Sequence, residues 1–160
     1  MIPYSRQEIN ADDIAAVVSA LQDDILTGGN KVAAFEQKIA DYLGVKYCIA
    51  VSSGTAALHT AYAVAGISEG DEVITTPLSF VATSNAALYV GAIPKFVDIN
   101  FDGNINVSKI EAAISDKTKA IVPVDYAGKP VDIRSIMQIA KKHNLVVIED
   151  AAHAFGSKFD

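Results

Sequence analysis

The sequence predicts an α/β fold in which a mainly parallel sheet is flanked by helices. Short apolar stretches of strand length alternate with amphipathic stretches of helix length from residue 46 to residue 150. No repeat, low-complexity tract or linker interrupts that alternation. The last apolar stretch, residues 145–150, is almost uninterrupted and ends in Glu149 and Asp150, a pattern typical of a strand buried on both faces of a parallel sheet.

The N-terminal part of the chain predicts two helices separated by a turn. Asn10 is a suitable N-cap for a first helix, and Gly44 is a suitable end for a second one over residues 32–43. Between them, Thr27, Gly28 and Gly29 break the chain. They could form a flexible turn or a loop whose backbone approaches a ligand closely, and their spacing favours the turn.

The next unit predicts a strand that leads directly into a helix. Residues 47–51, which include Cys48, form an apolar run that we expect to be a buried strand. Ser53, Gly54 and Thr55 follow and open a helix of small residues. Hydroxyls and free amides at a helix N-terminus can bind a phosphate, although an ordinary capped turn has the same local pattern.

The remaining elements continue the same alternation. Ser79 and Asp132 are positioned to cap helices, and Phe80 follows the end of a predicted strand, where it could pack in the interior or face an aromatic ring. We expect strands at residues 72–76, 94–99, 119–124 and 145–150, and helices at residues 81–90, 107–114 and 133–142.

Composition excludes several classes of function. The 160 residues are 51% hydrophobic and carry a mild net charge of −6, and they contain no basic run, which argues against nucleic acid or an anionic membrane as a partner. No signal peptide or membrane-spanning run is present, and the single cysteine suits a reducing compartment, so the cytoplasm is the expected location. Three scattered histidines and one cysteine form no metal-binding spacing, so no metal site is expected.

Chemically distinctive residues follow several of the predicted strands. Because carboxyl ends of parallel strands meet at one edge of a sheet, we expect these residues to gather there. They comprise an anion cup, an aromatic face, an acid and an imidazole: Ser53, Gly54, Thr55, Phe80, Asp150 and His153. This combination suits a phosphorylated heteroaromatic cation, and pyridoxal phosphate is the natural candidate.

The same residues lie in motifs that resemble those of the DegT/StrS family of pyridoxal-phosphate-dependent sugar aminotransferases, which have fold type I. The resemblance extends over essentially the whole chain, and among its members the enzymes of pseudaminic acid synthesis are the most similar. It is carried by IPYSRQ at 2–7, LTGG at 26–29, VSSGTAAL at 51–58, TPLSFVAT at 76–83, FVDI at 96–99 and IEDAAHA at 148–154.

The resemblance implies a role for each candidate residue. Asp150 would hold the pyridinium N–H, His153 would lie near the ring's 3-hydroxyl, and Phe80 would stack on the ring. Gly54 and Thr55, together with Ser53, would bind the phosphate. On the sugar-nucleotide side the resemblance places Tyr4, Thr27, Gly28 and Gly29. Asn30 stands where the family commonly has proline.

The resemblance also implies what the chain lacks. The family's Schiff-base lysine is expected beyond Asp160, so no catalytic residue is assigned within the chain. Residues 1–160 would be an incomplete large domain, with residues 1–30 as an N-terminal arm and the C-terminal small domain absent.

The implied activity is transfer of an amino group from an amino acid, with glutamate as the expected donor, to a keto-sugar nucleotide, by a full-length protein expected to be a homodimer. Two alternatives remain open. One is a sugar dehydratase of the same family in which histidine replaces the lysine, and the other is a non-catalytic fragment.

Overall fold

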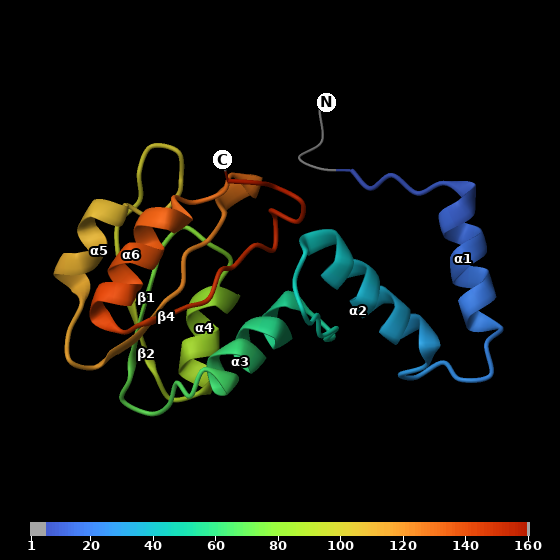
Figure 1. Ribbon diagram of the computed structural model, residues 1–160, viewed down its shortest axis with the longest axis horizontal. Coiled ribbons are helices and arrows are strands. Elements are labelled where there is room, and N and C mark those ends of the chain that lie inside the picture. The colour runs from blue at the N-terminus through green and yellow to red at the C-terminus, as the bar shows by residue number, and fades with distance from the viewer. Residues whose placement is uncertain (1–5, 160) are drawn as a thin grey trace. The chain divides into compact units, whose positions relative to one another are not determined.

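A computed structural model describes residues 6–159, which form two compact units that divide between Ala50 and Val51 (Figure 1). The first unit contains α1 (Ala11–Leu21) and α2 (Asn30–Leu43). Asn10 accepts hydrogen bonds from the amides of Asp12 and Asp13, and Asp13 accepts one from the amide of Asn10. This reciprocal capping confirms the predicted start of α1.

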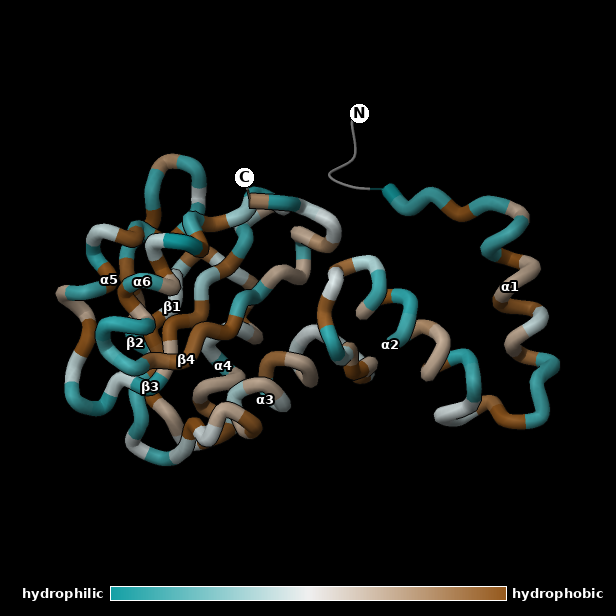
Figure 2. The backbone as a smooth tube through the Cα atoms, viewed as in Figure 1, coloured by the Kyte–Doolittle hydropathy of each residue, from teal (hydrophilic) through white to brown (hydrophobic). Residues whose placement is uncertain are grey.

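The turn between the two helices requires both of its glycines. Gly28 has φ +67°, and a Cβ on Gly29 would lie 2.8 Å from the backbone oxygen of Ile25. Gly44, with φ +66°, ends α2 as predicted. Along α1, apolar residues recur among polar ones, as the alternating colours of Figure 2 show, and none of its side chains is buried.

The strand expected at residues 47–51 is not formed. Tyr47 is 74% exposed and Ile49 is 72% exposed, while Cys48 is half-buried. The amide of Ala50 donates to the carboxylate of Glu36 at 2.8 Å instead of to a neighbouring strand. An apolar run becomes a strand only when its backbone pairs with another strand. None of the described strands pairs with residues 47–51.

The second unit is a parallel sheet with helices on both sides, which confirms the predicted fold class. Its four strands lie in the order β2-β1-β3-β4, and every pair is parallel. In chain order the elements are α3 (Gly54–Val64), β1 (Glu72–Thr75), α4 (Ala82–Tyr89), β2 (Ile93–Phe96), α5 (Val107–Ala113), β3 (Thr118–Ile121), the 3-10 turn η1 (Tyr126–Gly128), α6 (Ile133–His143) and β4 (Val146–Val147).

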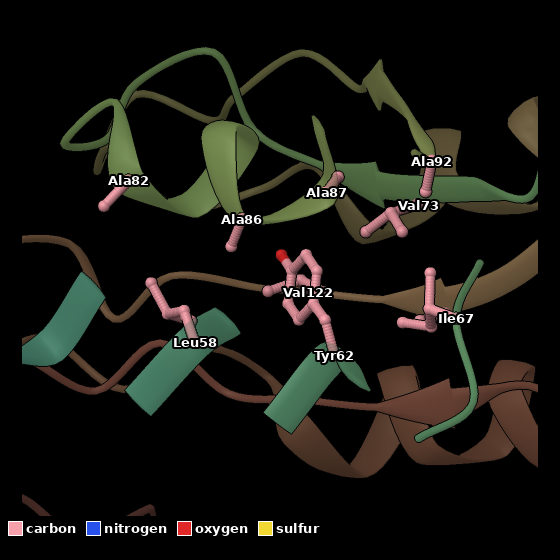
Figure 3. Close-up of a cluster of buried hydrophobic side chains, with 10 residues drawn as sticks. Leu58, Tyr62, Ile67, Val73, Ala82, Ala86, Ala87, Ala92 and Val122 are labelled. Carbon is pink, nitrogen blue, oxygen red and sulfur yellow. The ribbon is translucent and has the colours of Figure 1, made fainter. Parts of the chain in front are cut away.

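Two hydrophobic clusters cover the two faces of this sheet. Because consecutive strand residues point to opposite faces, neighbouring residues of β1 belong to different clusters. Val73 packs with Val122 and with α3 and α4, as Figure 3 shows for Leu58, Tyr62 and Ala86. Ile74 packs on the other face, with Ile121 and with α5 and α6 through Ile110 and Ile136.

One predicted helix cap of this unit is wrong, and its strands end earlier than predicted: β2 ends at Phe96, β3 at Ile121 and β4 at Val147. Ser79 does not cap α4, whose N-cap position is Val81 without a side-chain hydrogen bond, because the hydroxyl of Ser79 contacts that of Thr83 instead. β4 is shorter than residues 145–150, although the amide of Asp150 still donates to the carbonyl of Pro123. Asp132 caps α6 as predicted by accepting from the amide of Ser135.

Within residues 6–159, no helix has both the length and the hydrophobicity needed to cross a membrane.

Candidate functional site

A cavity of about 350 Å³ opens at the carboxyl edge of the sheet. The chain leaves β1 toward β2 on one side and leaves β3 toward β4 on the other, so the strand order reverses between β1 and β3. Segments that follow both strands line the cavity, through residues 78–80 and 124–126. Open α/β sheets bind their ligands at this reversal, and the volume suits a small cofactor.

One end of the cavity is the N-terminus of α3. A helix leaves its first four amides without intrahelical acceptors. Ser53 satisfies one of them, because its hydroxyl oxygen accepts from the amide of Ala56 at 3.1 Å. The carbonyl of Ser53 accepts from the next amide, that of Ala57, at 3.0 Å, which is the first hydrogen bond of the helix itself. The amides of Gly54 and Thr55 remain available, and both residues line the cavity.

Gly54 leaves this end of the cavity open. A Cβ at Gly54 would meet no protein atom within 4 Å, and its φ is not positive. The protein's own packing therefore does not require glycine here. A ligand that approaches the amides closely would require it, and the helix end favours an anion.

The cavity wall carries an aromatic ring. Phe80 is 74% exposed although it is large and apolar, and it lines the cavity beside Leu78 and Ser79. An exposed aromatic ring beside a concave surface can stack on a planar ligand.

Asp150 places a carboxylate on the same cavity. Its amide donates to the carbonyl of Pro123 and its carbonyl accepts from the amide of Asp125, which fixes its backbone beside the end of β3. Its Oδ2 accepts from the hydroxyl of Thr83 at 2.6 Å, and its Oδ1 accepts from the amide of Ala152 at 3.3 Å. Among the described residues no cationic side chain pairs with Asp150.

A second acid lies next to Asp150. Asp125 is 5% exposed and lines the cavity, and its Oδ1 accepts from the amide of Val131 at 2.9 Å. Burial raises the pKa of Asp125, and the negative charge of Asp150 raises it further against the opposing effect of the Val131 hydrogen bond. A cationic ligand would relieve this repulsion.

His153 completes the rim and lies against the loop that follows β3. A Cβ on Gly128 would lie 3.0 Å from the backbone oxygen of His153, and the hydroxyl of Ser157 donates to the carbonyl of Gly128 at 2.9 Å. The imidazole is exposed and lines the cavity. It is therefore accessible to a ligand placed between Phe80 and Asp150.

The structure brings most of the sequence-predicted site together. Gly54, Thr55, Phe80, Asp150 and His153 all line one cavity. Ser53 is not part of its lining and caps α3 instead.

The residues expected on the substrate side are not tested by this geometry. Tyr4 lies outside the described residues. Thr27, Gly28 and Gly29 lie in the first unit, and their role at the site stays a prediction.

Three residues of the site were missed by sequence reasoning: Thr83, Asp125 and Tyr126. Asp125 follows a predicted strand in the same way as Asp150, so strand ends alone could have indicated it. No local pattern indicates that Thr83 contacts Asp150. Among residues 6–159, no group of three or more His, Cys, Asp or Glu side chains is arranged to hold a metal ion.

The chain belongs to the DegT/DnrJ/EryC1/StrS aminotransferase family, whose sequence profile matches residues 7–160. The resemblance expected from the motifs is therefore confirmed. A relative from Campylobacter jejuni, named UDP-4-amino-4,6-dideoxy-N-acetyl-beta-L-altrosamine transaminase, is 48% identical over 99% of this chain.

Solved structures agree with that assignment and with fold type I. Helicobacter pylori PseC, described as an aminotransferase in pseudoaminic acid biosynthesis, has a TM-score of 0.95 and 41% identity over 99% of this chain. The PLP form of the putative sugar aminotransferase Spr1654 from Streptococcus pneumoniae has a TM-score of 0.90 and 31% identity over 97%. The chain spans less than half of each relative: 43% of the Campylobacter protein, 43% of PseC and 44% of Spr1654.

Proposed function

We propose that the protein that carries this chain is a pyridoxal-phosphate-dependent aminotransferase. It would move an amino group from an amino acid, with glutamate as the first donor to test, to a keto-sugar nucleotide. The observation that carries the proposal is the cavity at the sheet reversal, which combines free helix amides, an exposed aromatic ring and a carboxylate held by neutral donors. The family membership of the chain supports it.

The residues present fit pyridoxal phosphate from end to end. The amides of Gly54 and Thr55 would bind the phosphate at the positive end of α3, and the Thr55 hydroxyl would add a donor. Ser53 would contribute indirectly, because it caps the first turn that presents those amides. The open space over Gly54 supports close approach of a phosphate to the backbone.

The ring would lie between Phe80 and the edge of the sheet. Asp150 would accept the pyridinium N–H with a carboxylate oxygen that Thr83 and Ala152 leave partly unused. The ring's positive charge would also offset the repulsion between Asp150 and Asp125. His153 would contact the 3-hydroxyl of the ring. When bound, the cofactor supplies an electron sink, which Asp150 maintains by keeping the ring nitrogen protonated.

The finer features of the proposal follow from the relatives. We propose that the sugar substrate resembles that of the altrosamine transaminases and that Tyr4, Thr27, Gly28 and Gly29 lie on its side of the site. Residues 1–160 would be part of the large domain, with residues 1–30 as an arm, and the lysine that binds the cofactor covalently would lie outside them. We further propose a cytoplasmic homodimer.

The test is spectroscopic and uses the whole protein that carries this chain. After addition of pyridoxal phosphate, a cofactor absorption band should appear, and glutamate alone should shift it with release of 2-oxoglutarate. An Asp150→Ala variant should lose the shift, whereas Asp116→Asn, a change at an exposed aspartate of the same unit, should retain it. Absence of a bound cofactor band in the unmodified protein would refute the proposal.

Two alternatives are distinguished by the same material. A dehydratase of the family would bind the cofactor but would not release 2-oxoglutarate, and borohydride would trap no lysine adduct. A chain that functions only as residues 1–160 would be non-catalytic, so a stable reduced adduct formed by the isolated 160-residue chain would contradict that alternative.

A further inference from the structure

We propose that Thr83 is the positioning residue of Asp150, acting as the central member of a hydroxyl chain that runs from Ser79 through Thr83 to the carboxylate. The inference rests on the function proposed above and gives Thr83 and Ser79 roles that the proposed function does not assign to them. It starts from the buried position of Thr83, which is 1% exposed and lies in the first turn of α4.

The direction of this chain follows from counting hydrogens. Thr83 has one hydroxyl hydrogen and three oxygen neighbours: Asp150 Oδ2 at 2.6 Å, the Ser79 hydroxyl at 2.7 Å and the Phe80 carbonyl at 3.2 Å. A charged acceptor at the shortest distance takes the hydrogen, because hydrogen bonds to carboxylates are shorter and stronger than those to neutral oxygens. Thr83 therefore donates to Asp150, and Ser79 donates to Thr83.

This arrangement fixes one carboxylate oxygen and leaves the other mostly unoccupied. Oδ2 is held by Thr83, whereas Oδ1 has only the longer contact of 3.3 Å to the amide of Ala152. An ionised carboxylate offers about four acceptor positions, so acceptor capacity remains for a donor in the cavity. Without the Thr83 hydroxyl, the Asp150 side chain could rotate about its two torsions, and Oδ1 would then no longer face the cavity.

The backbone of Thr83 is itself held by a hydrogen bond from the core. The hydroxyl of Tyr62, a fully buried residue of α3, donates to the backbone carbonyl of Thr83 at 2.8 Å. Figure 3 shows the Tyr62 side chain extending from α3 toward α4, with its hydroxyl on the side of Ala86. The hydroxyl that orients Asp150 is thus attached to a rigid part of the core, as a positioning group requires.

The test compares variants that differ only in the hydroxyl at position 83. Thr83→Val removes it at nearly constant shape, and Thr83→Ser restores it. Thr75→Val is the matched control, because Thr75 is also fully buried but its hydroxyl donates to the carbonyl of Val122 at 2.8 Å and not to Asp150. All are made in the whole protein that carries this chain.

The first readout is binding discrimination. Dissociation constants are measured for pyridoxal phosphate and for its carbocyclic analogue, in which CH replaces the ring nitrogen. The preference for pyridoxal phosphate should fall about tenfold or more in Thr83→Val, because a hydrogen bond to a charged group is lost. It should recover in Thr83→Ser and stay unchanged in Thr75→Val. A general loss of stability would weaken both ligands equally and leave the ratio intact.

The second readout needs no cofactor. Three-bond NMR couplings to the Cγ of Asp150 should report one rotamer in the unmodified protein and in Thr83→Ser, and averaging in Thr83→Val. If the unmodified protein fails to bind the cofactor, the proposed function falls while this measurement still decides the role of Thr83. If Thr83→Val does not fold, Ser79→Ala replaces it and should reduce the preference two- to threefold, on the order of a neutral hydrogen bond. An unchanged ratio with a single Asp150 rotamer overturns the inference.

Discussion

Tyr62 donates its hydroxyl hydrogen to the backbone carbonyl of Thr83 across 2.8 Å, inside the layer formed by α3 and α4. α3 begins at the free amides of Gly54 and Thr55, and the first turn of α4 carries the hydroxyl that binds Asp150. This one bond therefore connects the helix that forms one end of the cavity to the helix whose hydroxyl holds the carboxylate of Asp150. It couples the packing of the core to the spacing of the site.

Tyr62→Phe should lower the free energy of unfolding by about 1 kcal/mol, the net value of one neutral hydrogen bond. The Thr83 carbonyl still accepts its backbone hydrogen bond within α4, so the larger penalty for an unpaired buried group does not apply. Urea denaturation measures the change. Tyr89→Phe is the control, because Tyr89 is 54% exposed, and its stability should be unchanged. Equal effects of both substitutions would contradict the role assigned to the Tyr62 hydroxyl.

Gly54→Ala should change stability and cofactor binding in opposite directions. An added Cβ meets no protein atom within 4 Å. The free energy of unfolding should therefore rise by about 0.5 kcal/mol, because alanine reduces the conformational freedom of the unfolded chain. The same Cβ stands over the free amides, so affinity for pyridoxal phosphate should fall about tenfold, which corresponds to about 1.4 kcal/mol. Thermal unfolding without ligand and fluorescence titration with it measure the two effects.

A loss of stability in Gly54→Ala would show that glycine is required by the fold itself. Unchanged cofactor affinity would show that no ligand approaches these amides.

The local elements of this chain could be predicted because their causes are local. The caps at Asn10 and Asp132 depend on residues two or three positions away, and both were found where the sequence indicated. The alternation of strands and helices likewise predicted the parallel sheet, and the carboxyl-edge argument predicted that Gly54, Phe80 and Asp150 would line one cavity.

What could not be predicted depends on contacts distant in sequence. Residues 47–51 have the composition of a strand, yet strand formation needs a partner that composition does not reveal. Thr83 and Asp150 are 67 positions apart, and only the contact between the first turn of α4 and the segment that follows β4 brings them together. Ser79 was expected to cap a helix because its hydroxyl can accept from a backbone amide. The sequence does not show that this hydroxyl instead forms a hydrogen bond with the hydroxyl of Thr83.

Asp125 should make stability fall as the pH rises. Burial raises its pKa in the folded state, with a further contribution from Asp150. Between the ordinary value of about 3.9 and the raised value, the folded protein holds a proton that the unfolded chain releases. The stability linked to this proton is complete at low pH and is lost as the pH rises through that window.

Asp125→Asn has no proton to lose, so it should gain stability relative to the unmodified protein as the pH increases above about 4. Urea denaturation from pH 4 to 8, without cofactor, measures the difference. Asp116→Asn, at an exposed position, should show a flat difference over the same range. A difference for Asp125→Asn that declines with pH would reverse the sign argued here.

The turn that contains Gly103 packs against the loop that contains Tyr126, a residue that lines the cavity. The buried Asn104 joins the two, because its side-chain amide donates to the carbonyls of Lys129 and Pro130 and its oxygen accepts from the amide of Tyr126. A Cβ on Gly103 would lie 2.4 Å from Cδ1 of Tyr126, closer than any real contact.

Gly103→Ala should therefore lower the free energy of unfolding by more than backbone strain alone would. Gly70→Ala is the matched control, because Gly70 has φ +85° against +89° for Gly103 but has no protein atom within 4 Å of an added Cβ. The control should lose about 1 kcal/mol from the left-handed conformation. Gly103→Ala should lose a further 1–3 kcal/mol, the usual range for overpacking. It should also weaken cofactor binding, since the displaced Tyr126 ring lines the cavity. Equal destabilisation by the two substitutions, with cofactor affinity intact, would mean that Tyr126 moves away from the added methyl group without disturbing the site.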